Sequence, residues 1–401
     1  MLGFGKDKSI PPFYGHKRIS GGHAATTLGE EALSMTKSHS LLRPEMAGLA
    51  PYNAGLTTEE VARRPGVTRV SKLGSNENPL GADPAVQQAL EAALQRIAVY
   101  PDPSGRALLA KLATRHGVST DRLVLGNGSE DLLAVLARAT LRPGDKVVTL
   151  YPSFPLHEDY ARLMGAEVVR IGLTPEGRID VDALVRAAAQ PVRLVLFANP
   201  MNPAGVWLSP RDLGRVLDAV HPDAITCLDE AYHEYAEGEG YASGTERLAT
   251  HRGPLLILRT FSKAWGLAGL RVGYGLTNNA ELKRGLDLAR TPFNVNLMAQ
   301  IAAEAALDHP QSVAEAAALV QRERPRMQQA IEGLGLRVLP SKGNFLFFET
   351  TRPSVELAEA LLDQGVIVKP WKQAGYENWL RVSIGTEADN AHFLKALAAS
   401  L

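Results

Sequence analysis

Short apolar runs alternate with amphipathic stretches along most of the chain. Helical spacing of apolar residues is clearest at 84–98 and at 105–117, where a glycine ends the pattern. Strand-type runs follow, and they are apolar throughout rather than alternating. Apolar strands separated by helices favour an α/β fold with a largely parallel sheet covered on both faces. The seven runs lie at 122–126, 146–151, 167–173, 192–200, 224–230, 255–262 and 271–276.

The pattern changes toward both ends of the chain. Residues 1–45 mix Gly, Pro, Ser and charged residues without a period, which predicts an N-terminal arm, possibly flexible, outside the fold. We expect 84–298 to form a large domain and 299–401 a smaller C-terminal α+β domain. Residues 46–83 are assigned to the N-terminal part of that small domain.

Composition narrows the classes of function. Lys+Arg and Asp+Glu both number 43, so no net positive field would attract nucleic acid or a membrane surface. The single cysteine, Cys227, excludes an internal disulfide and a multi-cysteine metal site, and is typical of a reducing compartment. No run approaches about eighteen apolar residues, and the N-terminus lacks the apolar core of a secretory signal. We expect a cytoplasmic protein whose partners are small molecules or another protein chain.

Polar residues follow several of the apolar runs. Asn199, Asp229 and Lys263 each come where a run ends, and ligands of parallel sheets bind beyond the C-terminal ends of the strands. A lysine in this position either extends its ammonium to water or, kept partly neutral by desolvation and nearby cations, attacks a carbonyl. An unpaired carboxylate at Asp229 would be costly, so we expect it to face a cationic partner.

Two further features would suit a phosphate. The stretch "GNGSED" (126–131) follows a strand and opens a helix, which offers free backbone N–H groups, although such turns are also common for structural reasons. Arg271, eight residues after Lys263, would cap a helix, form an ion pair, or return to the same pocket to hold a phosphate. Together with Asp229 for a ring cation, these groups describe one ligand, pyridoxal 5′-phosphate.

Seven motifs in order carry a resemblance to a known family. The motifs are "SNENPLG" (75–81), "YPD" (100–102), "GNGSED" (126–131), "NPMNPAG" (199–205), "DEAY" (229–232), "TFSKAWGLAGLR" (260–271) and "LRVSIGT" (380–386). From about residue 49 to the C-terminus the chain resembles the class I/II aminotransferases, and within them the histidinol-phosphate aminotransferases. The resemblance implies the type I fold of pyridoxal-phosphate-dependent transferases, and a homodimer with shared active sites in which 46–83 also forms an interface arm.

The resemblance implies roles around the cofactor. Lys263 would bond to the cofactor and carry the proton to and from the substrate, and Asp229 would pair with the ring nitrogen. Asn202 and Tyr232 would bind the phenolic oxygen. Tyr100 would reach the phosphate held by the neighbouring subunit. The other cofactor-binding residues are Gly128, Ser129, Glu130, Ser262 and Arg271 at the phosphate, and Phe154, which either stacks on the ring or belongs to the core.

The substrate side shows a departure from the family. The resemblance makes Arg381 the clamp for a substrate carboxylate or phosphate, with Asn202 beside it. Tyr52 and Asn344 correspond to further substrate positions, although both would also be ordinary surface or turn residues. Lys369 stands where these enzymes usually carry an arginine for the substrate phosphate, and a lysine lacks the planar fork. In "GNGSED" the family's usual acidic pair is also reversed.

The preferred function is a histidinol-phosphate:2-oxoglutarate aminotransferase of histidine biosynthesis. The alternatives are an aminotransferase for an aromatic or other amino acid and, less favoured, a phosphothreonine-type decarboxylase. A nicotinamide dehydrogenase would need a complete G-x-G-x-x-G, which "GNGSED" and "RVGYGL" do not supply. A Ser–Lys hydrolase would need separated residues, whereas Ser262 and Lys263 are adjacent. No metal site is expected, because His233 and Glu234 lack the H-E-x-x-H spacing, and a pure binding module is the least favoured class.

Overall fold

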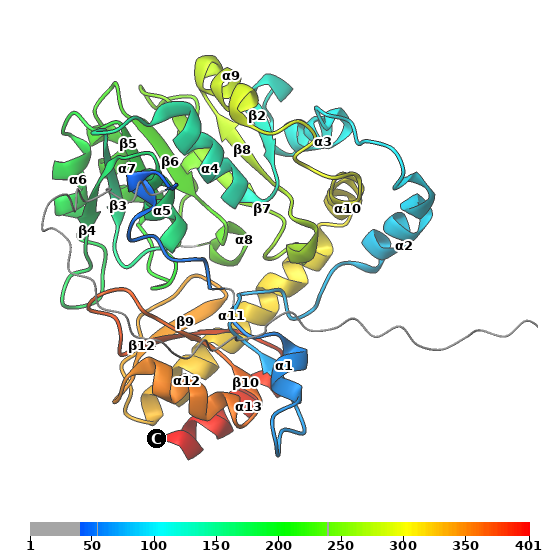
Figure 1. The fold of residues 1–401 in the computed structure, drawn as a ribbon, viewed down its shortest axis with the longest axis vertical. Coiled ribbons are helices and arrows are strands. Elements are labelled where there is room, and N and C mark those ends of the chain that lie inside the picture. Colours follow the sequence, from blue (N-terminus) through cyan, green and yellow to red (C-terminus); the bar gives the residue numbers. More distant parts are fainter. Residues whose placement is uncertain (1–40, 54, 239) are drawn as a thin grey trace, which may run out of the picture. The chain divides into compact units, whose positions relative to one another are not determined.

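A seven-stranded sheet forms the centre of the main layered part of the computed structural model (Figure 1). Its strand order is β2-β8-β7-β6-β5-β3-β4, and β8 alone runs in the direction opposite to the other strands. Each strand overlaps one of the seven apolar runs, so the predicted α/β fold with a mostly parallel sheet is confirmed. The strands are β2 (Leu123–Gly126), β3 (Lys146–Leu150), β4 (Glu167–Ile171), β5 (Leu194–Ala198), β6 (Ile225–Asp229), β7 (Leu255–Thr260) and β8 (Gly273–Thr277).

Helices cover both faces of this sheet. Alternate residues of β5 enter different apolar clusters: Val195 and Phe197 face one side, Leu194 and Leu196 the other. The second face packs on α4 (Ser129–Thr140), α5 (Pro155–Leu163) and α9 (Ala280–Ala289), which supply Leu132, Ala161 and Leu286 among others. The first face packs on α6 (Val181–Ala188), α7 (Pro210–Ala219) and α3 (Arg106–His116). Burial on both faces explains why the strands are apolar throughout.

A smaller part contains two further sheets. β9 (Phe345–Glu349), β11 (Lys369–Pro370) and β12 (Trp379–Ser383) form an antiparallel sheet in the order β11-β12-β9. β1 (Ser71–Lys72) pairs in parallel with β10 (Val366–Ile367), which joins the beginning of the described fold to its end. The nearby helices are α1 (Thr58–Ala62), α12 (Ser354–Leu362) and α13 (Glu387–Ser400). In Figure 1, α11 (Gln311–Gly333) runs from the large sheet to this smaller part.

The structure describes residues 41–401 except 54 and 239, and Pro44–Leu401 forms one unit. The other unit, Met1–Arg43, is described only at 41–43, which form no helix or strand, so most of the predicted arm lies outside the described residues. The other domain boundaries stay a prediction. The boundary at 298/299 falls inside α10 (Leu297–Asp308), which packs on α2 (Pro84–Ala93).

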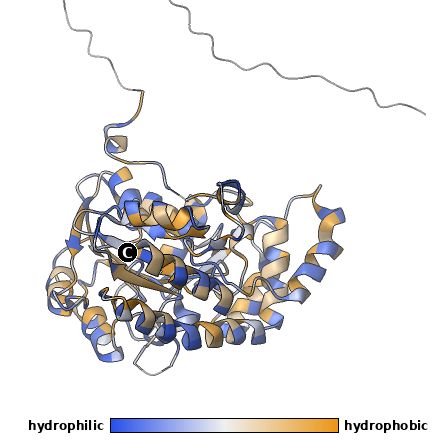
Figure 2. Ribbon diagram, turned by 90° about the horizontal axis from the view of Figure 1, so that it is seen from below, coloured by the Kyte–Doolittle hydropathy of each residue, from blue (hydrophilic) through white to orange (hydrophobic). Residues whose placement is uncertain are grey.

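Local sequence accounts for where helices begin and end. Asp83 caps α2 by accepting from the Ala85 N–H, and Pro84 occupies the first helical position. Gly117 ends α3 with a φ of 63°, as its position predicts. Surface helices carry mixed hydrophilic and hydrophobic residues along their length (Figure 2), and none of the described helices is long and apolar enough to cross a membrane. The short helices are α8 (His233–Ala236) and the 3-10 turns Pro44–Met46, Leu94–Arg96, Thr120–Arg122, Gly244–Arg247 and Ala268–Leu270.

Candidate active site

The predicted chemistry converges at the C-terminal edge of the large sheet. Asp229 is the last residue of β6. Lys263 comes three residues after the end of β7, at the same edge of the sheet. Asn202 follows β5, the neighbour of β6, and Phe154 follows β3. Arg381 reaches the same place from β12 of the smaller sheet, because its guanidinium contacts Asn202. The site therefore lies between the two sheets.

Lys263 is a half-buried lysine without a carboxylate partner among the described residues. Its Nζ donates to the Ser75 carbonyl oxygen at 2.9 Å and lies 5.7 Å from the centre of the Tyr232 ring. Burial, together with the positive charges of Arg381 and Arg271, lowers the pKa of Lys263 to about 7. A large fraction of this amine is therefore neutral and nucleophilic at physiological pH.

Asp229 is buried, with each carboxylate oxygen held by one partner. Its Oδ2 lies 3.1 Å from Nε2 of His157, and its Oδ1 accepts from the Ala231 N–H at 3.1 Å. His157 itself is almost fully buried, on the first turns of α5. Each oxygen keeps a free lone pair, so the carboxylate remains able to bind a further cationic N–H group.

Tyr232 is held by two asparagine amides. Its hydroxyl oxygen accepts from Nδ2 of Asn202 at 3.3 Å and from Nδ2 of Asn76 at 3.0 Å. Burial raises the pKa of Tyr232 to about 12, so the hydroxyl stays protonated at neutral pH. A protonated hydroxyl with its lone pairs occupied offers its hydrogen to a ligand.

Arg381 is a buried cation that no carboxylate among the described residues neutralises. Its Nη1 donates to Oδ1 of Asn202 at 2.7 Å and its Nη2 to the Gly74 carbonyl at 2.6 Å, while Nε has no partner within the described structure. Desolvation lowers the pKa of Arg381 from its ordinary value. A buried guanidinium with an unpaired N–H suits an anionic ligand.

A glycine-lined cradle lies at the N-terminus of α4. Gly128 precedes the helix with φ 83° and ψ 165°, and a Cβ there would lie 2.6 Å from Nη2 of Arg271. A Cβ on Gly273 would lie 2.5 Å from the Ser129 backbone nitrogen. Arg271 donates to Oγ of Ser262 at 3.2 Å. The two glycines therefore allow the helix N-terminus and the arginine to approach closely, and backbone N–H groups, an arginine and a hydroxyl that lie together suit a phosphate.

Glu130 lies at the edge of this cradle with its carboxylate turned toward other side chains. It accepts a hydrogen bond from the Tyr160 hydroxyl and lies 4.0 Å from Nη2 of Arg271. Asp131, the other member of the reversed acidic pair, accepts from the Asn127 N–H at 2.9 Å. The backbone N–H groups, rather than these carboxylates, are what the cradle presents.

The remaining predicted substrate residues differ in how exposed they are, from the exposed Tyr52 to the buried Asn344. Tyr52 packs edge-on against Phe154 with ring centres 6.1 Å apart, and Nζ of Lys369 lies 5.8 Å from the Tyr52 ring. Lys369 faces Arg381 directly across β11 and β12, and its pKa is lowered to about 8 by burial and by that neighbouring charge. Asn344 is fully buried and donates to the Asn76 carbonyl.

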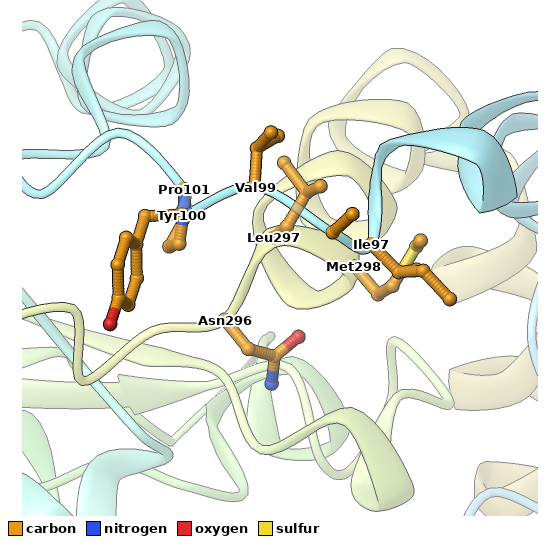
Figure 3. Close-up of a pocket in the computed structure, with 8 residues that line it drawn as sticks. Ile97, Val99, Tyr100, Pro101, Asn296, Leu297 and Met298 are labelled. Atoms are coloured by element: carbon orange, nitrogen blue, oxygen red, sulfur yellow. The ribbon is translucent and has the colours of Figure 1, made fainter.

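Tyr100 lies apart from these residues within the single chain. It is 80% exposed, and its ring stacks on Phe293 with centres 4.6 Å apart. It borders an apolar pocket. Figure 3 shows Tyr100 at one end of this pocket, and Ile97 and Met298 at the other end. The remaining lining residues are Ala98, Val99, Pro101, Asn296 and Leu297.

Sequence reasoning missed three residues of this site. His157 follows Phe154 by one helical turn, but nothing in the sequence pairs it with Asp229. Asn76 lies inside a motif that carried the resemblance, yet it was not singled out. Ser383 lies two residues after Arg381 and donates to Oδ1 of Asn76. The period of two along a strand would have placed Ser383 and Arg381 on one face.

The fold and site combine an α/β architecture with a half-buried lysine of lowered pKa at a sheet edge, a helix N-terminus beside an arginine, and a second, buried arginine. Residues 68–397 match the family model described as aminotransferase class I and II. The chain belongs to this family, as the sequence resemblance predicted.

Named relatives agree with this membership. The chain is 51% identical to histidinol-phosphate aminotransferase 1 of Mesorhizobium japonicum, over 92% of this chain and 100% of that protein. It is 49% identical to histidinol-phosphate aminotransferase 3 of Rhizobium meliloti, over 89% and 96% of the two chains.

Solved structures share the fold. A histidinol-phosphate aminotransferase from Sinorhizobium meliloti in complex with pyridoxal-5′-phosphate matches with a TM-score of 0.81 at 27% identity, over 91% of this chain and 98% of that chain. An L-threonine-O-3-phosphate decarboxylase from Porphyromonas gingivalis matches with 0.73 at 25% identity, over 82% and 99%. The same fold thus occurs in an aminotransferase and in a decarboxylase, so the reaction must be inferred from the residues of the site and not from the fold.

Proposed function

We propose that this protein transfers the amino group of histidinol phosphate to 2-oxoglutarate, with pyridoxal 5′-phosphate as cofactor. The observation that carries the proposal is the half-buried Lys263, whose pKa of about 7 leaves its amine reactive beside Asp229 and a phosphate cradle. The two relatives that are 51% and 49% identical over most of the chain are both named histidinol-phosphate aminotransferases, which supports histidinol phosphate as the amino donor.

The residues present fit this cofactor. Gly128 and Gly273 let Arg271 and the first N–H groups of α4 come close together, because a Cβ on either glycine would collide with them, and these are the groups that a phosphate requires. Asp229 keeps lone pairs for the ring N–H, and Tyr232 has a hydroxyl hydrogen for the phenolic oxygen. The ring centres of Phe154 and His157 lie 5.7 Å apart in an edge-on arrangement, and Phe154 would supply an aromatic ring for the cofactor ring to stack on.

When bound, pyridoxal 5′-phosphate supplies a carbonyl for amines and a conjugated ring that takes up the electron pair left at the substrate α-carbon. Lys263 Nζ would take up and return the proton of that carbon, since its neutral form is well populated near pH 7. Asp229, whose carboxylate is held by His157, would keep the proton on the ring nitrogen. Tyr232 would donate its hydrogen to the phenolic oxygen.

The substrate anion is held on the side of the smaller sheet. We assign Arg381 to the phosphate of the donor and to a carboxylate of 2-oxoglutarate, because its buried Nε has no other partner in the described structure. Lys369 adds a second positive charge on the neighbouring strand. Tyr52, beside Phe154 and Lys369, is assigned to the exposed side of the site, and Asn344, which binds the Asn76 carbonyl, to its buried side.

We further propose a homodimer with shared sites. Ile97, Val99 and Tyr100 are 70%, 62% and 80% exposed, and they surround the apolar pocket of Figure 3. Apolar residues that cluster in this way mark a protein–protein contact. The position of Tyr100 there supports its reaching the partner's cofactor phosphate. We also propose a cytoplasmic location, which the single, buried Cys227 supports.

A donor screen tests the activity. We expect turnover of histidinol phosphate with 2-oxoglutarate to exceed turnover of phenylalanine at equal concentration, without release of CO2. Faster turnover of phenylalanine would establish an aromatic aminotransferase, and CO2 release a decarboxylase. The purified protein should show the visible absorption of the lysine-bound cofactor, and Lys263→Ala should abolish it. A protein that stays colourless with added cofactor would refute the proposal.

A further inference from the structure

Asn76 contacts several residues of the site, but none of the roles proposed above for cofactor or substrate binding involves it. It is buried, with 1% exposure, and it adopts a left-handed backbone conformation with φ 56°. Every polar group of its side chain and backbone meets a residue of the site.

Ser383 fixes the orientation of the Asn76 amide. The Ser383 Oγ accepts from the Asn76 backbone N–H at 2.9 Å, and it donates its own hydrogen to Asn76 Oδ1 at 2.8 Å. Asn344 Nδ2 donates to the Asn76 carbonyl at 3.0 Å. With its oxygen engaged by Ser383, the amide turns Nδ2 toward Tyr232, whose hydroxyl oxygen lies 3.0 Å away.

Arg381 fixes the second asparagine in the same way. Its guanidinium can only donate, so the Asn202 atom at 2.7 Å must be Oδ1. The Asn202 Nδ2 then points to Tyr232 at 3.3 Å. Arg381 and Ser383 lie two residues apart on β12 and so share one face of the strand. One strand thus orients both amides that meet at the tyrosine.

Two amide donors exhaust the acceptor capacity of the Tyr232 hydroxyl, which has two lone pairs and one hydrogen. Within the part of the chain that the structure describes, the hydroxyl makes no hydrogen bond as a donor. We propose that Asn76, locked by Ser383, is a positioning residue that commits the Tyr232 hydrogen to the cofactor's phenolic oxygen and strengthens that hydrogen bond. The inference rests on the proposed function, because it concerns how the chain binds that cofactor.

The direction of the effect follows from the donor arrangement. A hydroxyl that accepts hydrogen bonds becomes a better donor, by about 10–30% per bond. Its hydrogen bond stabilises negative charge on the phenolic oxygen, and so it lowers the pH at which the visible absorption of the holoenzyme changes. Loss of the Asn76 amide should therefore raise that pH. The opposite amide orientation, with Tyr232 donating to Asn76, predicts a fall, because removal of Asn76 would free the hydrogen.

The experiment is a pH titration of the visible absorption of the holoenzyme. Asn76→Gly removes the amide while tolerating the left-handed backbone, and we expect it to raise the midpoint by roughly 0.2–0.6 pH unit. Asn76→Asp replaces the donor by an acceptor that competes for the Tyr232 hydrogen, so we expect a larger rise. Ser383→Ala should move the midpoint in the same direction as Asn76→Gly. A fall or an unchanged midpoint in Asn76→Gly overturns the inference.

Asn278→Ala is the matched control. The Asn278 side chain also makes three hydrogen bonds, with the backbone of His251, Gly253 and Leu255, but it does not contact Tyr232. We expect it to lower the melting temperature of the cofactor-free protein while leaving the absorption midpoint unchanged. If the absorption midpoint of Asn278→Ala shifted as much as that of Asn76→Gly, the shift would reflect a general loss of stability, and the inference would be overturned. Failure of the wild-type protein to bind the cofactor would instead refute the proposed function.

Discussion

Replacing Gly128 by alanine should weaken cofactor binding, because the single added Cβ atom would displace the Arg271 side chain. The residue adopts φ 83° and ψ 165°, a region that costs a non-glycine residue about 1–3 kcal/mol. The new Cβ would lie 2.6 Å from Nη2 of Arg271, so the guanidinium must move out of the cradle. Loss of one charged hydrogen bond to the phosphate removes about 1.5–3 kcal/mol of binding, which corresponds to roughly 10- to 150-fold weaker affinity.

Two measurements separate strain from displacement of the arginine. Gly144→Ala is the matched control, because Gly144 also has a positive φ, of 85°, but no atom lies within 4 Å of its would-be Cβ. Both variants should lower the melting temperature of the cofactor-free protein. Only Gly128→Ala should raise the cofactor Kd, as followed by titration of the visible absorption. Equal losses of affinity in the two variants, or none in Gly128→Ala, would refute the assignment of the cradle.

Three further predictions follow from the substrate side and the interface. Arg381→Ala should lower kcat/KM for histidinol phosphate by about 100-fold or more while retaining cofactor, since it removes a buried anion partner; loss of cofactor would contradict the assignment. Lys369 has a pKa of about 8, so its charge is present below that pH and lost above it. kcat/KM for the phosphorylated donor should therefore decline above pH 8 and decline less in Lys369→Arg, whereas identical profiles would dismiss Lys369. Mixed dimers of one Tyr100→Phe and one Lys263→Ala subunit should keep one intact site with wild-type cofactor affinity, because the intact Lys263 would be completed by Tyr100 of the other subunit. Absence of such a site would show that Tyr100 acts within its own chain.

The cofactor side of the site could be predicted from the sequence because it follows from strand ends. Asn199, Asp229 and Lys263 each come where an apolar run ends, and parallel strands bring such ends to one edge without knowledge of side-chain contacts, whereas Asn202 is indicated by the family resemblance. His157 and Asn76 could not be found in this way. Their partners are 72 and 156 residues distant, and an ordinary buried histidine or asparagine has the same local sequence. Only the packing of α5 and of the segment before α2 gives them a role.

The choice of substrate depends on a contact that no local pattern reveals. Lys369 and Arg381 are separated by a loop, and their pairing depends on the register of β11 with β12. Directly opposite residues of an antiparallel pair have side chains on the same face, so two cations lie side by side, and Arg381 contributes to the lowered pKa of Lys369. Such repulsion is relieved best by a ligand with concentrated negative charge. A phosphate group meets this requirement, whereas the single carboxylate of phenylalanine meets it less well, and the register therefore favours the phosphorylated donor.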